Sequence, residues 1–205
     1  MIPVEIRDLA REEMVWGADV AARGMRDNPM HVAAWGADPR HRLKVSERMF
    51  RALLPVLSHA PIAAWRGAHA VGVVCMSEPG RCPLALRQMV RMFPRQRPLG
   101  PADMRRTMSW VSVWRARDPD EPHWHLGPVA VEPGLQGMGI GSQMMEEFAR
   151  RMDRERAVAY LETDKLVNVR FYERFGFETL DERVVLGVPN WFMRRAAGLA
   201  GSTGS

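Results

Sequence analysis

The sequence is poor in the residues that would build a disulfide framework or a cysteine-based metal site. Its 205 residues include two cysteines, Cys75 and Cys82, which have no histidine or acidic partner at ligand spacing. We therefore expect neither a zinc centre nor a stabilising disulfide, and predict one buried strand thiol and one loop thiol. No metal is expected among the cofactors.

Long apolar runs are also lacking, since none approaches the ~20 residues that span a bilayer. The chain does not open on a basic segment followed by an apolar one, and residues 1–9 alternate as a strand does. We therefore expect a cytoplasmic protein. No linker or internal repeat divides the chain, so we expect a single domain over residues 1–197 and a disordered tail over residues 198–205.

Lysine is scarce, and arginine supplies nearly all of the positive charge. Lys44 and Lys165 are the only lysines, the formal net charge is +5 and the pI is about 10.0. Arginine clusters within residues 91–97 and 150–156 could contact nucleic acid, but acidic residues are interleaved and no nucleic-acid module is recognisable. We expect a solvated surface that attracts an anionic cofactor, with no nucleic-acid or membrane partner.

Hydrophobic periodicity predicts strands mixed with helices. Between residues 83 and 117, two amphipathic segments are separated by residues 94–101, whose prolines and glycine interrupt regular structure. Residues 20–120 are where we expect a binding pocket to be built. Strands are expected over residues 3–9, 61–65, 70–76, 123–131, 157–162, 177–185 and 191–195, and helices over 12–27, 41–57, 84–93, 102–114, 139–153 and 166–174.

A glycine-rich segment follows the strand that ends at Val131. Residues 136–142 read Gln-Gly-Met-Gly-Ile-Gly-Ser and lead into a helix. The glycines leave the main chain accessible, and the free amides of the first helical turn add partial positive charge. The segment lacks the lysine of a nucleoside-triphosphate loop, and Ser142 stands where a dinucleotide fingerprint needs its third glycine. We expect the segment to bind the pyrophosphate of another cofactor.

Two motifs in order resemble the signatures of the GNAT superfamily of N-acetyltransferases. Gln-x-x-Gly-x-Gly at residues 136–141 is similar to the acetyl-CoA loop, and residues 168–177, with Asn168, Tyr172 and Gly176-Phe177, are similar to the second signature. The likeness covers roughly residues 124–194 and is greatest to bacterial small-molecule and antibiotic acetyltransferases. It implies an α/β (α+β) fold, with a mixed, mostly antiparallel sheet of six to seven strands, a splayed central strand pair and helices on both faces.

The apolar phase of the strand before the glycine segment changes at residues 127–128. Apolar residues occupy even positions at Trp124 and Leu126, and odd positions at Val129 and Val131. Because side chains alternate between the two faces of a strand, this change predicts a β-bulge. In the resembled family a bulge here frees main-chain groups that accept the pantetheine arm.

The resemblance also implies which residues act. Val129 would polarise the thioester carbonyl through its N–H, and Tyr172 would donate a proton or a hydrogen bond to the coenzyme A sulfur. The base is left open between His125, Glu162 and His123. The cofactor-binding residues would be Val129, Ala130, Val131, Gln136, Gly137, Met138, Gly139, Ile140, Gly141, Ser142, Asn168 and Tyr172.

These features predict an acetyl-CoA-dependent N-acetyltransferase that acts directly on the primary amine of a small molecule in a ternary complex. Three alternatives stay open, namely protein or peptide N-acetylation, a non-catalytic acyl-CoA-binding module, and a nucleic-acid-binding role. The sequence does not identify the acceptor. A homodimer is also left open, and exposed Trp110, Trp114 or Trp191 would favour it.

Overall fold

The computed structural model describes residues 3–81 and 99–198, and within these parts seven strands form one sheet. The strands are β1 (Glu5–Asp8), β2 (Ile62–Arg66), β3 (His69–Ser77), β4 (Trp124–Val131), β5 (Ala159–Thr163), β6 (Phe177–Val185) and β7 (Val188–Arg195). Their order in the sheet is β1-β2-β3-β4-β5-β7-β6. Neighbours are antiparallel except β4 and β5, which are parallel. The predicted mixed, mostly antiparallel sheet is confirmed.

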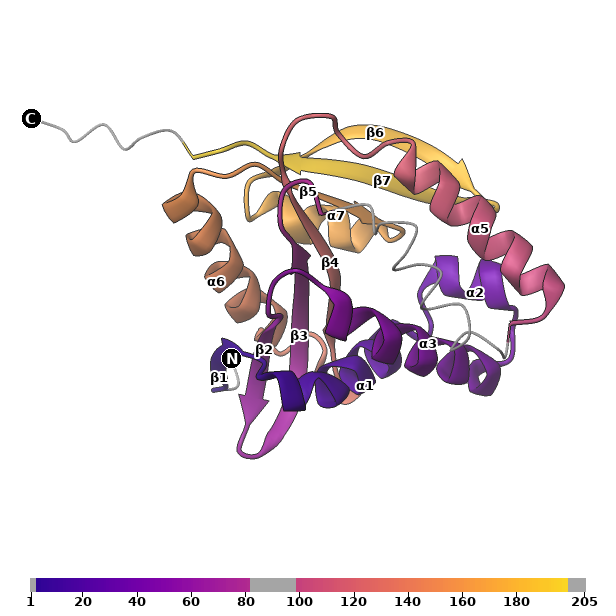
Figure 1. Ribbon diagram of the computed structural model, residues 1–205, viewed down its shortest axis with the longest axis horizontal. Coiled ribbons are helices and arrows are strands. Elements are labelled where there is room, and N and C mark those ends of the chain that lie inside the picture. The colour runs from indigo at the N-terminus through magenta and orange to yellow at the C-terminus, as the bar shows by residue number, and fades with distance from the viewer. Residues whose placement is uncertain (1–2, 82–98, 199–205) are drawn as a thin grey trace, which may run out of the picture.

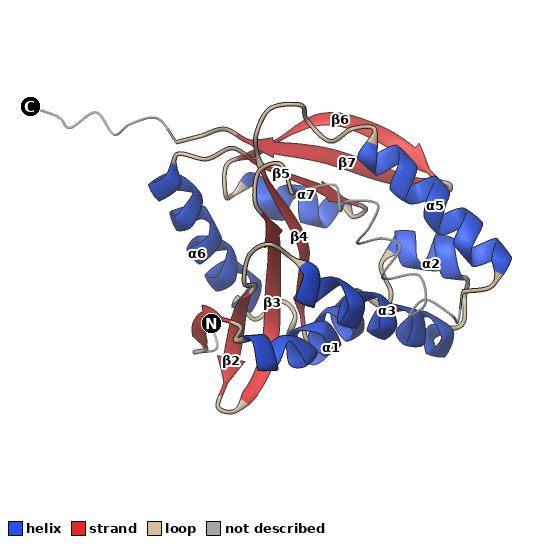
Figure 2. Ribbon diagram, viewed as in Figure 1, coloured by secondary structure: helices blue, strands red, loops and turns tan. Residues whose placement is uncertain are grey.

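Helices cover both faces of this sheet, as Figures 1 and 2 show. They are α1 (Met14–Met25), α2 (Pro29–Trp35), α3 (Pro39–Leu53), α5 (Pro101–Arg115), α6 (Ile140–Glu155) and α7 (Leu166–Glu173), with short 3-10 turns at Arg11–Glu13, Leu54–Val56 and Pro133–Leu135. On one face, Ala18 of α1 and Phe50 of α3 share an apolar cluster with Val73 of β3. On the other face α6 and α7 pack, and so the prediction of helices on both faces is also confirmed.

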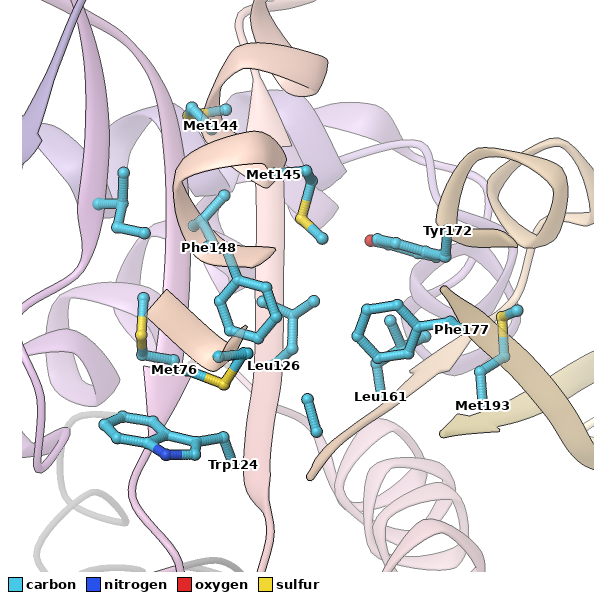
Figure 3. Close-up of a cluster of buried hydrophobic side chains, with 14 of the residues drawn as sticks. Met76, Trp124, Leu126, Met144, Met145, Phe148, Leu161, Tyr172, Phe177 and Met193 are labelled. Carbon is cyan, nitrogen blue, oxygen red and sulfur yellow. The ribbon is translucent and has the colours of Figure 1, made fainter. Parts of the chain in front are cut away.

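The side chains of α6 fill the largest core cluster (Figure 3). Met144, Phe148 and Met152 recur at every fourth position and are completely buried. They share the cluster with Leu126 of β4 and Phe177 of β6. Burying side chains of this size stabilises the fold by about 1.5–3 kcal/mol each. The apolar stripe of this helix is therefore core packing, as its spacing predicts, and it fixes the direction in which the N-terminus of α6 points.

The chain after α1 differs from the expectation. Asn28 and Pro29 predict the end of a helix, and α1 does end at Met25, but Pro29 also begins α2, which was not expected. Proline is favoured at the first helical position, because its φ is preset and its missing N–H would have no helical partner there. Asn28 is extended, with φ −63° and ψ 140°, and so turns the chain between the two helices.

Other expectations fall partly outside the described residues. Cys75 is completely buried in β3, as expected. Cys82 and the helix expected over residues 84–93 lie outside the described residues, as does the expected tail beyond Gly198.

The three tryptophans that would favour a dimer are not exposed. Trp110 is buried, and Trp114 and Trp191 are half-buried. They therefore give no support to a homodimer. Among the described helices, none combines the length and the apolar character that crossing a bilayer requires.

Candidate functional site

Strand β4 carries the predicted bulge. Val74 of β3 pairs with Val129, whereas Met76 pairs with Leu126. These partners are two positions apart on β3 but three positions apart on β4. The additional residue therefore lies within Gly127-Pro128. Side chains before and after the bulge contact the same core cluster below α6, which is the result that the phase change in the sequence predicts.

Beyond the bulge, β4 and β5 separate. The two strands pair only through Trp124 and His125 of β4. On the other side of β4, the N–H of Glu132 donates to the carbonyl oxygen of Val71 at 2.9 Å. Hydrogen-bonded and non-hydrogen-bonded pairs alternate in an antiparallel ladder, so the main-chain groups of Val129 and Val131 point away from β3. They face the gap between β4 and β5.

The glycine segment turns the chain from β4 into α6. Gly137 and Gly139 have φ values of 77° and 82°, which favour glycine because a Cβ would be strained there. Gly139 precedes the first residue of α6, and no side chain caps this terminus. The first amides of a 16-residue helix are thus turned outward beside the bare main chain of the segment. Such a terminus suits an anionic ligand.

Gln136 links this segment to its surroundings. Its Nε2 donates to the carbonyl oxygen of Val131 at 3.1 Å and to that of Gly24 in α1 at 3.5 Å. The side chain therefore holds the end of β4, the start of the glycine segment and α1 together.

A cavity of about 500 Å³ lies between the separated strands and the N-terminus of α6. All of the expected cofactor-binding residues line it except Met138, which is 41% exposed. His125 and Glu162 do not line it. The expected residues that do are Val129, Ala130, Val131, Gln136, Gly137, Gly139, Ile140, Gly141, Ser142, Asn168 and Tyr172.

Several lining residues were missed by the sequence analysis. Gly24 and Asn28 come from α1 and the turn after it, while Lys165, Phe171 and Arg174 come from the ends and inner face of α7. Only Gly24 carried a usable signal, because an isolated glycine inside an amphipathic helix often marks a close backbone approach.

Two cations border this cavity. Lys165 Nζ donates to Asn28 Oδ1 at 2.7 Å. Arg174 places its guanidinium 5.0 Å from the ring centre of Phe171 and donates to Ser142 Oγ at 3.4 Å. The charge around the glycine segment is therefore positive, in agreement with its helix terminus.

Asn168 and Tyr172 lie one turn apart on α7. The Asn168 side chain donates to Thr163 Oγ1 at 3.1 Å, which anchors α7 to β5. Tyr172 is buried, and its hydroxyl points from α7 toward α6 in Figure 3. Burial, together with the negative charge of Asp164, raises the pKa of the Tyr172 phenol.

The candidate bases lie on the face of the sheet opposite α6, because Trp124 and Leu126 on either side of His125 point toward α6. His125 Nε2 is 3.1 Å from Glu162 Oε2, and His125 Nδ1 is 3.3 Å from Asp118 Oδ1. The Glu162 side chain is only 3% exposed. The imidazole of His125 thus bridges two carboxylates.

His123 approaches the same aspartate. Its Nε2 is 3.3 Å from Asp118 Oδ1, and its Nδ1 is 2.8 Å from the carbonyl oxygen of Glu121. Burial raises the pKa of Asp118, but hydrogen bonds with His123 and His125 outweigh burial and hold that pKa well below its usual range. The sequence analysis missed Asp118, because a single aspartate in a turn carries no signal of its own.

Comparison with known families gives a match to the model of the acetyltransferase (GNAT) family over residues 28–177. Among solved structures, a histone acetyltransferase HPA2 and related acetyltransferase from Corynebacterium glutamicum superposes with a TM-score of 0.67 at 17% identity, covering 98% of this chain and 99% of that one. The polyamine N-acetyltransferase of Drosophila melanogaster gives 0.69 at 12% identity, covering 95% and 100%.

A third similar structure is a GNAT family acetyltransferase from Brucella melitensis in complex with acetyl-CoA. Its TM-score is 0.55 at 16% identity, covering 99% of this chain and 94% of that one. At these identities the structures share a fold with this chain.

Proposed function

Because this chain belongs to the GNAT family of acetyltransferases, we propose that it transfers the acetyl group of acetyl-CoA directly to the primary amine of a small molecule. The observation that carries the proposal is the direction of the Val129 and Val131 main chain. These groups face away from β3 into the cavity that the glycine segment also lines. A ligand with amides along its length and a pyrophosphate at one end fits both features.

In this proposal the pyrophosphate lies at the N-terminus of α6. The amides of residues 137–142 donate to its oxygens, and Lys165 and Arg174 add charge attraction. The pantetheine arm pairs with Val129 and Val131 in place of the missing strand, with Asn168 beside it. The Brucella melitensis structure, which contains acetyl-CoA, supports this choice of co-substrate.

The reaction needs no covalent enzyme intermediate. The neutral amine attacks the thioester carbonyl, the N–H of Val129 stabilises the oxyanion that forms, and the C–S bond then breaks to release the thiolate. Tyr172 donates a hydrogen bond to that sulfur. Since burial raises its pKa, the phenol stays protonated, and it stabilises the thiolate more than it transfers a proton to it.

Glu162 and His125 are proposed to remove the proton of the amine. Glu162 accepts it through a water molecule, and His125, whose ring nitrogens lie 3.1 Å from Glu162 and 3.3 Å from Asp118, passes it on. His123 contacts the same Asp118 oxygen and supports this arrangement. The pair lies outside the cofactor cavity, on the face from which an acceptor could approach.

The acceptor is proposed to be a small cationic amine. Two poorly exposed carboxylates, Asp118 and Glu162, lie beside His125 on the face of the sheet opposite α6, which we call the acceptor face. Their negative charge attracts one ammonium group. The Drosophila melanogaster relative acts on polyamines, which supports a small acceptor. The Corynebacterium glutamicum relative is named a histone acetyltransferase, so protein acetylation is the competing assignment.

A thiol-release assay tests the proposal. Purified protein is incubated with acetyl-CoA and, in parallel, with polyamines, aminoglycosides, aminonucleosides, amino acids and lysine-containing or free N-terminal peptides. We expect at least one small amine to release coenzyme A with an N-acetylated product visible by mass spectrometry. If only the peptides are acetylated, the small-molecule assignment is contradicted. If acetyl-CoA binds but no amine is acetylated, the protein is not a catalyst for these amines.

A further inference from the structure

Asp118, His123 and His125 form a cluster on the acceptor face, outside the cofactor cavity. Their ligand atoms, Asp118 Oδ1, His123 Nε2 and His125 Nδ1, all lie within 4.8 Å of one another. The carboxylate oxygen is 3.3 Å from each of the two nitrogens. The side chains are 12%, 6% and 18% exposed. The cluster is therefore largely desolvated and reachable from the His125 side.

The other ring nitrogen of each histidine is already engaged. His123 Nδ1 is 2.8 Å from the carbonyl oxygen of Glu121, which can only accept, so Nδ1 carries the hydrogen of the neutral ring. His125 Nε2 is 3.1 Å from the Glu162 carboxylate, which accepts the ring hydrogen in the tautomer that turns the Nδ1 lone pair toward Asp118. In these tautomers each neutral imidazole directs a lone pair toward Asp118. In the metal-free protein, hydrogens on these ring nitrogens bond to Asp118 and lower its pKa. A cation at the point where the three donor atoms converge would replace those hydrogens.

We propose that this cluster binds a divalent transition-metal ion, and that the ion bound in the cell is Zn²⁺. Ligands about 2.0–2.1 Å from a tetrahedral ion lie roughly 3.3–3.4 Å apart, and both measured separations are 3.3 Å. Charge-assisted hydrogen bonds between nitrogen and carboxylate are shorter, at about 2.7–2.9 Å. A set of two imidazoles and one carboxylate suits Zn²⁺ or Co²⁺ better than Mg²⁺.

The residues around the cluster match the outer shell of such a site. Metal-binding histidines usually donate their second N–H to a carboxylate or a backbone carbonyl, which fixes the tautomer and the ring orientation. Glu162 fills this role for His125, and the Glu121 carbonyl fills it for His123. The sequence expectation of no metal used cysteine spacing, and so it could not include Asp118.

A bound ion is expected to inhibit acetyl transfer. His125 Nδ1 would be occupied by the metal and could not pass a proton from Glu162 to Asp118. This consequence rests on the proposed function, whereas the metal site itself does not. Binding is therefore measured without acetyl-CoA.

The test uses untagged protein treated with EDTA and dialysed, then titrated with Co²⁺ and followed by visible absorption. We expect one equivalent to bind, with the intense bands of four-coordinate Co²⁺, and Zn²⁺ to remove them by competition. Asp118→Asn and His123→Gln should abolish the bands, and Glu162→Gln should weaken binding roughly 10- to 100-fold. His41→Gln is the control, because His41 also lies 2.7 Å from a carboxylate, that of Asp103, but belongs to no group of three such ligands in the described residues.

Wild-type protein that shows no Co²⁺ bands, or Asp118→Asn protein that binds as wild type does, would overturn the proposal. Thermal midpoints without metal establish whether each variant folds, and Glu162→Gln decides the matter if Asp118→Asn does not fold. Zn²⁺ should also lower turnover at saturating acetyl-CoA. Unchanged turnover with a fully occupied site would refute the proton relay while leaving the metal site intact.

Discussion

A Cβ atom added to Gly24 of α1 would lie 2.7 Å from the carbonyl oxygen of Val131 on β4. The backbones of the helix and the strand thus approach each other more closely than any side chain permits. Both residues line the cavity beside the N-terminus of α6, and Gln136 donates to both of their carbonyl oxygens. The position of one wall of the cavity therefore depends on this glycine.

Gly24→Ala should weaken acetyl-CoA binding and lower stability. Alanine normally gains about 1 kcal/mol over glycine inside a helix, but overpacking costs about 1–3 kcal/mol, and the opposing atom is backbone, which cannot rotate away. We expect the steric cost to dominate. Isothermal titration and thermal unfolding measure the two effects, with Gly134→Ala as the control because its added Cβ meets nothing within 4 Å. Equal behaviour of the two variants would contradict the argument.

Acetyl-CoA should raise the thermal midpoint of the protein, whereas NAD and ATP should not. A ligand at 100 times its Kd stabilises the native state by about 2.7 kcal/mol. For a protein of this size that is a rise of about 5–10 °C. Differential scanning fluorimetry measures the shift, and desulfo-CoA, which keeps the pyrophosphate, serves as a positive control. Equal shifts with all nucleotides would reject the choice of cofactor.

Tyr172→Phe should lower kcat with little change in acetyl-CoA affinity. The phenol acts on the departing sulfur, so its loss affects the transition state more than the bound ground state. We expect a decrease of about 100-fold, the lower end for acid catalysis, because a hydrogen bond replaces full proton transfer. Phe171→Leu is the comparison, since Phe171 lines the cavity without a polar group. If Tyr172→Phe retains full turnover, Tyr172 has no role at the sulfur.

His31 should make the protein less stable in mild acid. It is buried against Trp35, and within the described residues its Nδ1 has no hydrogen-bond partner. Burial lowers the pKa of His31 to about 3, whereas the unfolded value is about 6.5. The unfolded state therefore binds the additional proton, and stability falls as the pH decreases from 6.5 toward 3.

The measurement for His31 is urea unfolding of wild type and His31→Phe. Between pH 7.5 and 4.5, protonation of His31 should lower the free energy of unfolding of the wild type by about 2–3 kcal/mol. The decrease for His31→Phe should be smaller by this amount. Phenylalanine keeps an aromatic ring beside Trp35 and Trp110. Parallel pH profiles for the two proteins would show that His31 does not titrate as described.

The residues that line the cavity beside α6 could largely be predicted from the sequence, because their signals are local. The glycines that need positive φ, Gly137 and Gly139, are two positions apart, and the bulge changes the apolar phase within one strand. Lys165 could not be predicted, because its partner Asn28 is 137 positions away in the sequence. Asp118 is only five and seven positions from His123 and His125, but a single aspartate in a turn carries no signal of its own. Helix α2 was missed because Asn28-Pro29 both ends one helix and begins the next.

The two residue pairs that join β4 to β5 are the only strand pairing between the β1–β4 part and the β5–β7 part of the sheet in the described chain. A coenzyme bound in the gap between β4 and β5 would pair with the main chain of β4. It would thereby make the surface on which the amine binds more rigid. We therefore expect an obligatory order, with the thioester loaded first. Initial-rate patterns with a dead-end amine should then be uncompetitive against acetyl-CoA.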